Sequence, residues 1–471
     1  MNRSSRRSMM GLREHRSSVL VAALSAAFGV VLLRLTTILA TVMTANQIGQ
    51  FAAVRDALSV LASVFIIIAV YVSAIVTTNT FATVIAGRTR MIALLRLIGS
   101  SATTQRRAVA REGLAVGTIG GLAGAVAGLV MTSIGVGVMV ATGVMPDLSY
   151  GFADTIDVLP VVVVVLTTWL ASWVGSRRVL AVSPMQAVGA QQELSQEASL
   201  RRTGRNVTAI LLFAAGLLLL ALGIVVGMAS PLGLVIAALG GAVSFTGVVL
   251  GAHLIMPSVL RLSGRAFGRS APARLASANA VRYPERSTRT TIGLVIGVTL
   301  VTMFAVAEQS FDHMISSEFA GNAADLRAMQ NVLGAVFGIF SGLVGFSGVI
   351  AGVGMVNNLS LNVLQRTREL GLLRALGFTS TQIRKTIMIE SAQTVLAATV
   401  TGLILGVFYG WAGAQSLVSS VVGDGRLLPP SIPWVIVVVV FAAAAVLSVS
   451  AAAAPTRRAT RVSPIVALAV D

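Results

Sequence analysis

Long apolar runs separated by short polar segments make up almost the whole chain. A helix needs about 20 apolar residues to cross the hydrocarbon core of a bilayer, and ten runs reach or approach that length. The pattern therefore predicts an all-α polytopic membrane protein. The expected transmembrane helices are residues 17–43, 58–85, 114–140, 158–174, 207–228, 232–256, 291–306, 332–355, 392–412 and 434–452.

The basic N-terminus followed by an apolar run resembles the start of a signal peptide. The run at 17–43 is too long for one, and no cleavage site is evident after it. We therefore expect this run to be retained as the first span. With ten spans, both termini lie on the same side of the membrane.

Composition and charge agree with this topology. Only 11% of the residues are charged, whereas soluble domains have about 25%. The net charge of +18 raises the possibility of nucleic-acid binding, but the position of the charges argues against it. The chain has 35 lysines and arginines. All of them except Arg34, Arg55, Arg327 and Arg426 lie on the side of the membrane that holds the N-terminus. The positive-inside rule places that side, with both termini, in the cytoplasm.

An internal repeat divides the chain. Residues of the loop after the second span recur 278 positions later: Arg88-Thr89-Arg90 as Arg366-Thr367-Arg368, Leu94-Leu95-Arg96 as Leu372-Leu373-Arg374, and Gly99 as Gly377. A further match follows the last span of each unit, where Val182-Ser183-Pro184 recurs as Val462-Ser463-Pro464. Such self-similarity indicates two copies of one structural unit.

The repeat and the spans together give a 4 + 2 + 4 arrangement. A basic segment at 1–16 precedes a first four-span unit at 17–190. Linkers and a two-span insert (207–256), turning at Ser230-Pro231, occupy 191–274, and a second four-span unit occupies 275–471. Because each unit has an even number of spans, the two lie parallel in the membrane, a common plan among transporters.

The repeated loop has the features of a docking element. In the second copy, Leu372, Leu373 and Leu376 share one helical face, and Gly377 suits a C-cap. Thr379-Ser380-Thr381 can N-cap the following helix. Such a helix either docks a partner or rests on lipid headgroups, and its occurrence at matched positions in both units favours docking. The candidate docking residues are Arg88, Arg90, Leu94, Leu95, Arg96, Gly99, Arg366, Arg368, Glu369, Leu372, Leu373, Arg374 and Gly377.

These residues resemble a known family. The stretch 366–377 is similar to the signature of the FtsX-like/MacB-like permeases, and the stretches 279–286 and 461–468 resemble flanking segments of the same domain. The ten-span plan is similar to the BceB-like branch. The first copy departs from the signature, since Met91 and Ala93 replace its acidic residue and its glycine.

The resemblance implies a mechanotransmission permease, in which two separate ATPase subunits dimerise on ATP and push on the docking helices. The chain's single lysine, Lys385, does not follow a Gly-x-x-x-x-Gly motif, so we expect ATP and Mg to bind the partner ATPase. We expect no catalytic residue, cofactor or metal site in this chain.

Short outer loops, at 44–57 and 307–331, leave no room for a folded domain. We therefore expect export or extraction of an amphipathic substrate (a peptide, lipid, lipoprotein or hydrophobic drug) from the membrane or its surface. The alternative is a signalling protein that activates an extracellular partner such as a cell-wall hydrolase, with a sensor kinase as another possible partner. Acidic residues inside spans, which an ion-coupled carrier needs, are absent from the ten segments.

Three polar residues within spans have two interpretations each. Arg34 and Tyr71 either belong to a substrate path or are structural, with Arg34 near the outer interface. His253 is either a hydrogen-bonded core residue or a ligand. Acidic residues gather in two outer loops, Asp147, Asp154 and Asp157 in one and Glu308, Asp312, Glu318 and Asp325 in the other. They either form a vestibule for a cationic substrate or are simply tolerated there.

Overall fold

The computed structural model describes residues 16–45, 100–143, 146–175, 203–268, 270–282, 284–318, 372–422 and 427–461. It also describes a set of helical residues in the second predicted span, namely Val60, Ser63, Val64, Ile67, Ile68, Tyr71, Ala74, Ile75 and Thr78. Every regular element in these parts of the chain is a helix. The elements are α2 (Arg16–Ala45), α5 (Ala102–Ala141), η2 (Thr155–Asp157), α6 (Val158–Gly175), α10 (Thr203–Gly227), α11 (Gly233–Gly264), η3 (Arg265–Phe267), α12 (Ala271–Arg282), α13 (Pro284–Glu318), α16 (Ser380–Val422) and α17 (Trp434–Arg461).

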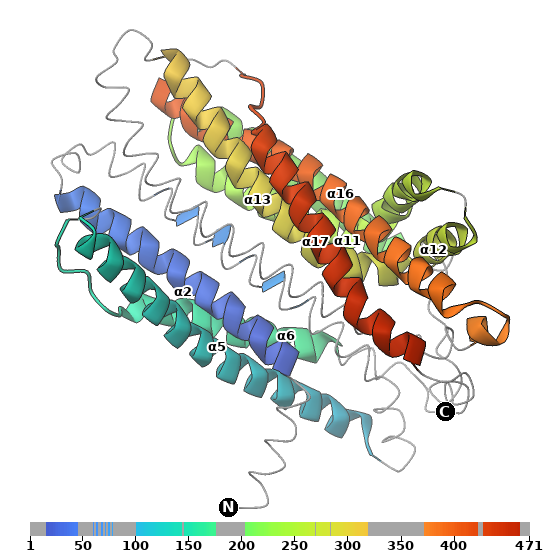
Figure 1. Ribbon diagram of the computed structural model, residues 1–471. Coiled ribbons are helices and arrows are strands. Elements are labelled where there is room, and N and C mark those ends of the chain that lie inside the picture. The colour runs from blue at the N-terminus through green and yellow to red at the C-terminus, as the bar shows by residue number, and fades with distance from the viewer. Residues whose placement is uncertain are drawn as a thin grey trace, which may run out of the picture.

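The long helices form two groups of the same design (Figure 1). Helix α5 packs between α2 and α6 in the first group, and α16 packs between α13 and α17 in the second. The described residues between 60 and 78 lie between the two groups, where Val60 and Val64 pack on Leu234 of α11. The equivalent arrangement of α2–α5–α6 and α13–α16–α17 is what a repeated unit predicts.

The two-helix insert packs on the second group. Helices α10 and α11 form an antiparallel hairpin that turns at Ser230-Pro231, as expected, and both helices contact α16. Glycines allow the close approach within the hairpin: a Cβ on Gly216 would lie 2.2 Å from the backbone nitrogen of Ser244, and one on Gly247 would lie 2.5 Å from that of Phe213. Small residues at helix contacts let backbones approach in this way.

The repeat extends into the packing of the third span of each unit. A Cβ on Gly124 or Gly128 of α5 would meet the backbone of α2 at 2.1 and 3.0 Å. The residues 278 positions later, Gly402 and Gly406 of α16, contact α13 in the same way, with Val298 and Thr302 at 2.7 and 2.5 Å. Glycines one turn apart therefore seat α5 on α2 and α16 on α13.

The described helices account for most of the predicted spans. Seven are long and apolar enough to cross a membrane, and the apolar part of α17, Trp434–Ser450, is somewhat shorter. The span predicted at 332–355 lies outside the described residues, so the complete 4 + 2 + 4 arrangement stays a prediction.

Several helices extend well beyond the apolar runs that predicted them. Helix α5 begins at Ala102 rather than at 114, α13 begins at Pro284, and α11 continues through Pro257 to Gly264. A polar turn can continue a helix because the backbone hydrogen bonds do not depend on side-chain polarity. Hydropathy therefore marks the membrane-crossing part of a helix and not the ends of the helix.

Basic residues gather at one end of the molecule, here called the basic end. Helix α2 begins and α17 ends there (Figure 1), and Arg106, Arg205, Arg265 and Arg384 lie on the helix segments at this end. Arg34 lies toward the opposite end of α2. The charge segregation seen in the sequence is therefore present in the fold.

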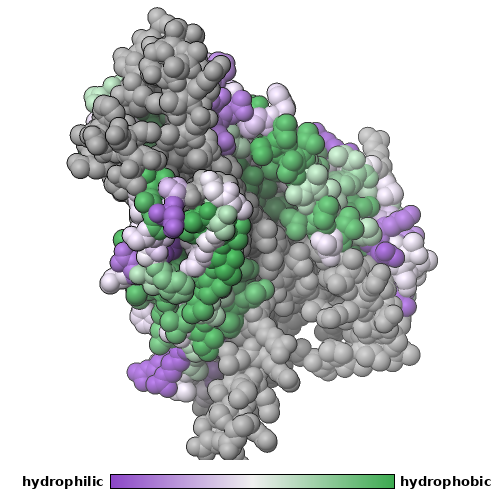
Figure 2. All heavy atoms as spheres, turned by 60° about the vertical axis from the view of Figure 1, so that its left-hand side comes forward, coloured by the Kyte–Doolittle hydropathy of each residue, from purple (hydrophilic) through white to green (hydrophobic). Residues whose placement is uncertain are grey.

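Large apolar side chains are exposed on the flanks of the helices. Leu122 and Val126 on α5 and Leu218 on α10 are 61%, 62% and 72% exposed. In Figure 2, hydrophobic residues cover much of the visible flank and hydrophilic residues gather toward its ends. Exposed apolar surface of this extent is typical of contact with lipid.

Candidate functional site

The strongest site candidate is a short turn at the basic end, residues 372–379, here called the capped turn. Residues 372–375 are helical, and Gly377 follows with φ +95°. The amide of Gly377 donates to the carbonyl of Arg374 at 3.0 Å, and the amide of Phe378 donates to that of Leu373 at 3.0 Å. This pair of bonds is a Schellman motif, which needs a residue with positive φ and therefore favours glycine. The predicted C-cap role of Gly377 is confirmed.

The next residues of the capped turn start α16. Thr379 is the N-cap: its hydroxyl accepts from the amide of Gln382 at 3.2 Å, and its own amide donates to the Gln382 side chain at 2.9 Å. These reciprocal bonds form a capping box. In the first unit Ser101 caps α5 through the amide of Thr104 at 3.2 Å. Ser101 and Thr379 are 278 residues apart, so the cap is part of the repeat.

The capped turn has one face fixed to α16 and another exposed. Leu373 and Phe378 pack against Ile383 and Ile387 of α16, both of which are buried. Leu372 and Leu376 are outside this cluster and are 53% and 72% exposed. The prediction that Leu372, Leu373 and Leu376 share one face is therefore wrong, because Leu373 packs on α16 and the other two are exposed. Arg374 is half-buried. A rigid turn with two exposed leucines is suited to receive a partner.

Most of the other candidate docking residues lie outside the described part of the chain. These are Arg88, Arg90, Leu94, Leu95, Arg96, Gly99, Arg366, Arg368 and Glu369. The structure therefore brings together Leu372, Leu373, Arg374 and Gly377, and the docking role of the whole set stays a prediction.

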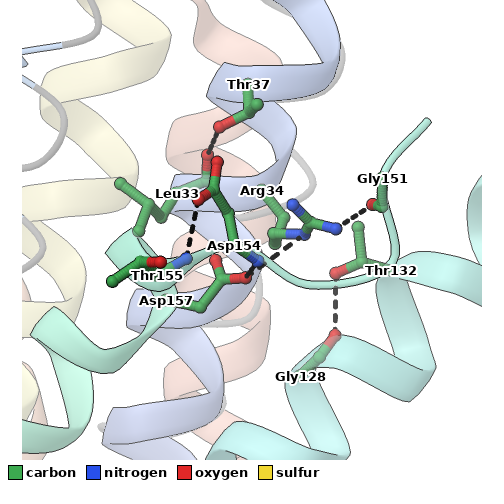
Figure 3. A network of polar contacts seen from close by, with 9 residues as sticks. All are labelled: Leu33, Arg34, Thr37, Gly128, Thr132, Gly151, Asp154, Thr155 and Asp157. Atoms are coloured by element: carbon green, nitrogen blue, oxygen red, sulfur yellow. Dashed lines mark hydrogen bonds and ion pairs between the residues drawn. The ribbon is translucent and has the colours of Figure 1, made fainter. Parts of the chain in front are cut away.

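Arg34 lies toward the end of α2 that is opposite the basic end, and Figure 3 shows the polar site around it. Its guanidinium Nε lies 3.7 Å from a carboxylate oxygen of Asp157, and another guanidinium nitrogen donates to the carbonyl of Gly151. Both charged side chains are about nine-tenths buried, at 7% and 6% exposed. Each charge of a buried pair compensates the other, whereas either charge alone would be strongly unfavourable there.

The same carboxylate organises the loop that carries it. Asp157 accepts from the amide of Asp154 at 2.8 Å, and Asp154 in turn caps η2 by accepting from the amide of Thr155 at 2.6 Å. Arg34 therefore ties this loop to α2, a structural role. Of the acidic residues named for a vestibule, Asp157 pairs with Arg34 and Asp154 caps η2, and the vestibule role of the others stays a prediction. The substrate-path role of Arg34 stays a prediction.

A tyrosine precedes this loop segment. The hydroxyl of Tyr150 donates to the carbonyl of Pro146 at 2.8 Å. Partial desolvation and, secondarily, the negative charge of Asp147 raise the pKa of Tyr150. A raised pKa favours the neutral phenol, which is the form that donates this hydrogen bond.

Tyr71 and His253 both make specific hydrogen bonds in the interior. The Tyr71 hydroxyl is 2.8 Å from the Thr246 hydroxyl of α11, and the Tyr71 ring packs edge-on against Phe245. His253 uses both ring nitrogens, with the Asn206 side chain at 2.8 Å and the Leu250 carbonyl at 3.0 Å. The interpretation of His253 as a core residue is confirmed.

Among the buried polar residues that sequence reasoning missed is Gln393 in α16. It is fully buried, and its amide group donates to the carbonyl of Leu260 at 2.7 Å and accepts from the Ser277 hydroxyl at 3.3 Å. Gln393 thereby links α16 to the end of α11 and to α12. The signal in the sequence was an amide residue inside an apolar run.

The comparison with known families matches both copies of the repeat. The family model described as FtsX-like permease C-terminal matches residues 63–184 and 341–464, together more than half of the chain. The chain therefore belongs to the FtsX-like permease family. The two matched segments begin at residues 63 and 341, which differ by 278, the shift of the repeat.

Individual relatives place the chain among the permeases of ABC transporters. It is similar to the ABC transporter permease YknZ of Bacillus subtilis, with 30% identity over 162 residues, which is 34% of this chain and 37% of that protein. The macrolide export ATP-binding/permease protein MacB of Rhodopirellula baltica is 32% identical over 160 residues, 33% of this chain and 22% of MacB. The permease YtrF of Bacillus subtilis is 28% identical over 127 residues, 26% of this chain and 29% of YtrF.

The matches span well under two thirds of each relative's length. With the family assignment and the apolar helices, they define the chain as a multi-pass membrane protein of the ABC permease class.

Proposed function

We propose that this chain is the permease subunit of an ABC transporter that exports or extracts an amphipathic substrate, driven by a separate ATPase through mechanotransmission. The capped turn carries the proposal. It is a rigid element, closed by a glycine on one side and by an N-cap on the other, and it presents Leu372 and Leu376 outward at the basic end. In the proposed orientation that end faces the cytoplasm, where an ATPase binds.

The packing supports transmission of a push from the capped turn through the membrane. The contacts of Leu373 and Phe378 with Ile383 and Ile387 fix the turn to α16. Helix α16 has 43 residues and is about 65 Å long at ~1.5 Å per residue, twice the thickness of the hydrocarbon core. Its glycines Gly402 and Gly406 seat it against α13. A displacement of the turn would therefore move α16 and α13 together.

The first unit supplies the second docking site in this proposal. Helix α5 begins with an equivalent cap at Ser101, and the repeated loop precedes it in the sequence. One chain would then bind two ATPase subunits. Because Met91 and Ala93 depart from the family signature, the first contact would be the weaker, and Arg374→Glu would impair assembly more than Arg96→Glu.

The surface and the relatives support the proposed substrate class. The loop that joins α5 to α6 is short and folded back onto Arg34, so it presents no separate receptor domain. Relatives named for macrolide export support a hydrophobic or amphipathic compound. The alternative, activation of an extracellular partner such as a cell-wall hydrolase, has no specific support in the described residues.

Reconstitution tests whether ATP hydrolysis belongs to a separate subunit. The chain alone, in phospholipid vesicles, should show no ATP hydrolysis above background, because the phosphate-binding loop would be on the partner. Addition of the ABC ATPase that binds it should produce hydrolysis that rises when a cationic peptide, a lipopeptide or a macrolide is added. ATP hydrolysis by the chain alone, or failure of the ATPase to bind it, would contradict the proposal.

A further inference from the structure

A cavity lies where the second span of the first unit meets the second group of helices. Its volume is about 160 Å³, and its wall comes from the described residues between 60 and 78, from α10, α11, α13 and α16. The side chains that shape it are large and apolar, including Ile68, Phe245, Met303 and Phe304. Apolar cavities of about 150 Å³ stay free of water and accept apolar molecules.

The polar groups in the wall are few and uncharged. The described residues that line the cavity include no charged side chain. Tyr71 and Tyr409 direct their hydroxyls to Thr246 and Ser244 of α11, at 2.8 and 2.9 Å, and so present their rings. Thr299 is 4% exposed, and its hydroxyl forms no hydrogen bond within the described part of the protein. None of the described lining residues would compensate the charge of a lipid headgroup. The cavity therefore suits a hydrocarbon occupant.

The cavity is long and runs parallel to the helices. Its wall extends along α13 from Ile296 to Phe311, a distance of about 22 Å at ~1.5 Å per residue. It extends from Val64 to Ile75 along the second span, about 16 Å by the same rise. All the lining residues of α10, α11, α13 and α16 belong to candidate membrane spans. The space therefore has the direction and depth of a lipid tail in one leaflet.

We propose that this cavity binds one acyl chain of a phospholipid from the surrounding bilayer. The chain enters from the end opposite the basic end, where Leu234, Phe311 and Leu417 line the cavity, and the headgroup stays outside. The bound chain fills the space between the first unit, the insert and the second unit. Binding of the acyl chain needs no ATP. The proposed lipid site does not depend on the proposed export function.

Two glycines in the wall allow the cavity to be filled by mutation. A Cβ on Gly413 of α16 would meet no atom within 4 Å, and one on Gly241 of α11 would meet only the Tyr409 ring, at 3.9 Å. Gly413→Phe and Gly241→Leu therefore place side chains in the cavity without displacing the backbone. Gly135 of α5 is a matched control, since its Cβ would also meet nothing within 4 Å and it lies on an exposed flank outside the cavity.

Photolabelling tests the site in the full chain. The protein is reconstituted, without ATP, into vesicles of phosphatidylethanolamine and phosphatidylglycerol that contain a phosphatidylglycerol with a diazirine in the middle of one acyl chain. After irradiation, mass spectrometry should find label on α13 between Ile296 and Phe311. Gly413→Phe and Gly241→Leu should reduce that label by ~5-fold or more because they occupy the space of the chain, and Gly135→Phe should leave it unchanged.

Label on the exposed face of α5, at Leu122 and Val126, serves as the internal reference and should be equal in all four proteins. Thermal unfolding shows whether Gly413→Phe and Gly241→Leu fold. One folded variant of the two is enough for the test. Equal α13 labelling in native and filled proteins would overturn the proposal. So would α13 labelling that appears only when the ATPase and ATP are added, because the occupant would then be transported cargo and not a bilayer lipid.

Discussion

Asp157→Ala is expected to lower the free energy of unfolding by about 3–5 kcal/mol, because it leaves the buried Arg34 guanidinium without its carboxylate. The variant also removes the acceptor of the Asp154 amide. Thermal or denaturant unfolding of the detergent-solubilised protein measures the change. The effect should concentrate in the first group of helices, where α2 holds Arg34 and η2 precedes α6.

Two controls separate the ion pair from a general effect of the loop. Asp147→Ala removes an exposed carboxylate from the same loop and should change stability by no more than ~0.5 kcal/mol. The double variant Arg34→Leu and Asp157→Leu removes both charges and should recover most of the loss, since apolar replacement of a buried pair is often neutral. Equal stability of Asp157→Ala and Asp147→Ala would contradict the account of Arg34.

Leu376→Glu is expected to weaken binding of the ATPase by ~10-fold or more. Burial of a leucine side chain contributes about 1.5–3 kcal/mol, and each 1.4 kcal/mol corresponds to a factor of ten in affinity. Leu376 is 72% exposed and lies outside the cluster that fixes the capped turn to α16. The substitution should therefore affect docking and leave the fold intact.

Leu262→Glu is the matched control for this prediction. Leu262 lies near the basic end of α11 and is 64% exposed, but it is not part of the repeated loop. Affinity of the ATPase for detergent-extracted permease should fall for Leu376→Glu and stay near the native value for Leu262→Glu. If both variants lose affinity equally, the effect is one of charge at the basic end and not of the capped turn.

Features with a local cause could be predicted from the sequence. The glycine cap at Gly377 and the N-cap at Thr379 follow from residues that adopt those conformations wherever a helix ends or begins. Apolar runs located the membrane-crossing parts of α2, α10 and α13. The shift of 278 located the second copy of each feature, and it holds even for the glycines that seat α5 on α2 and α16 on α13.

Features that depend on contacts between distant segments could not be predicted in this way. Arg34 and Asp157 are separated by the whole of α5, and hydropathy placed both near the outer interface without pairing them. The attachment of the insert to α16, through Gln393 and its contacts with Leu260 and Ser277, depends on helix packing. The cavity arises from side chains of five helical segments, and no single segment carries a sign of it.

The central claim is that one copy of this chain carries both docking sites of the transporter. Native mass spectrometry of the detergent-extracted complex with its ATPase measures the stoichiometry directly. The account predicts one permease chain with two ATPase subunits, because the docking loop occurs once in each of the two units of a single chain. A complex of two permease chains with two ATPase subunits would contradict it.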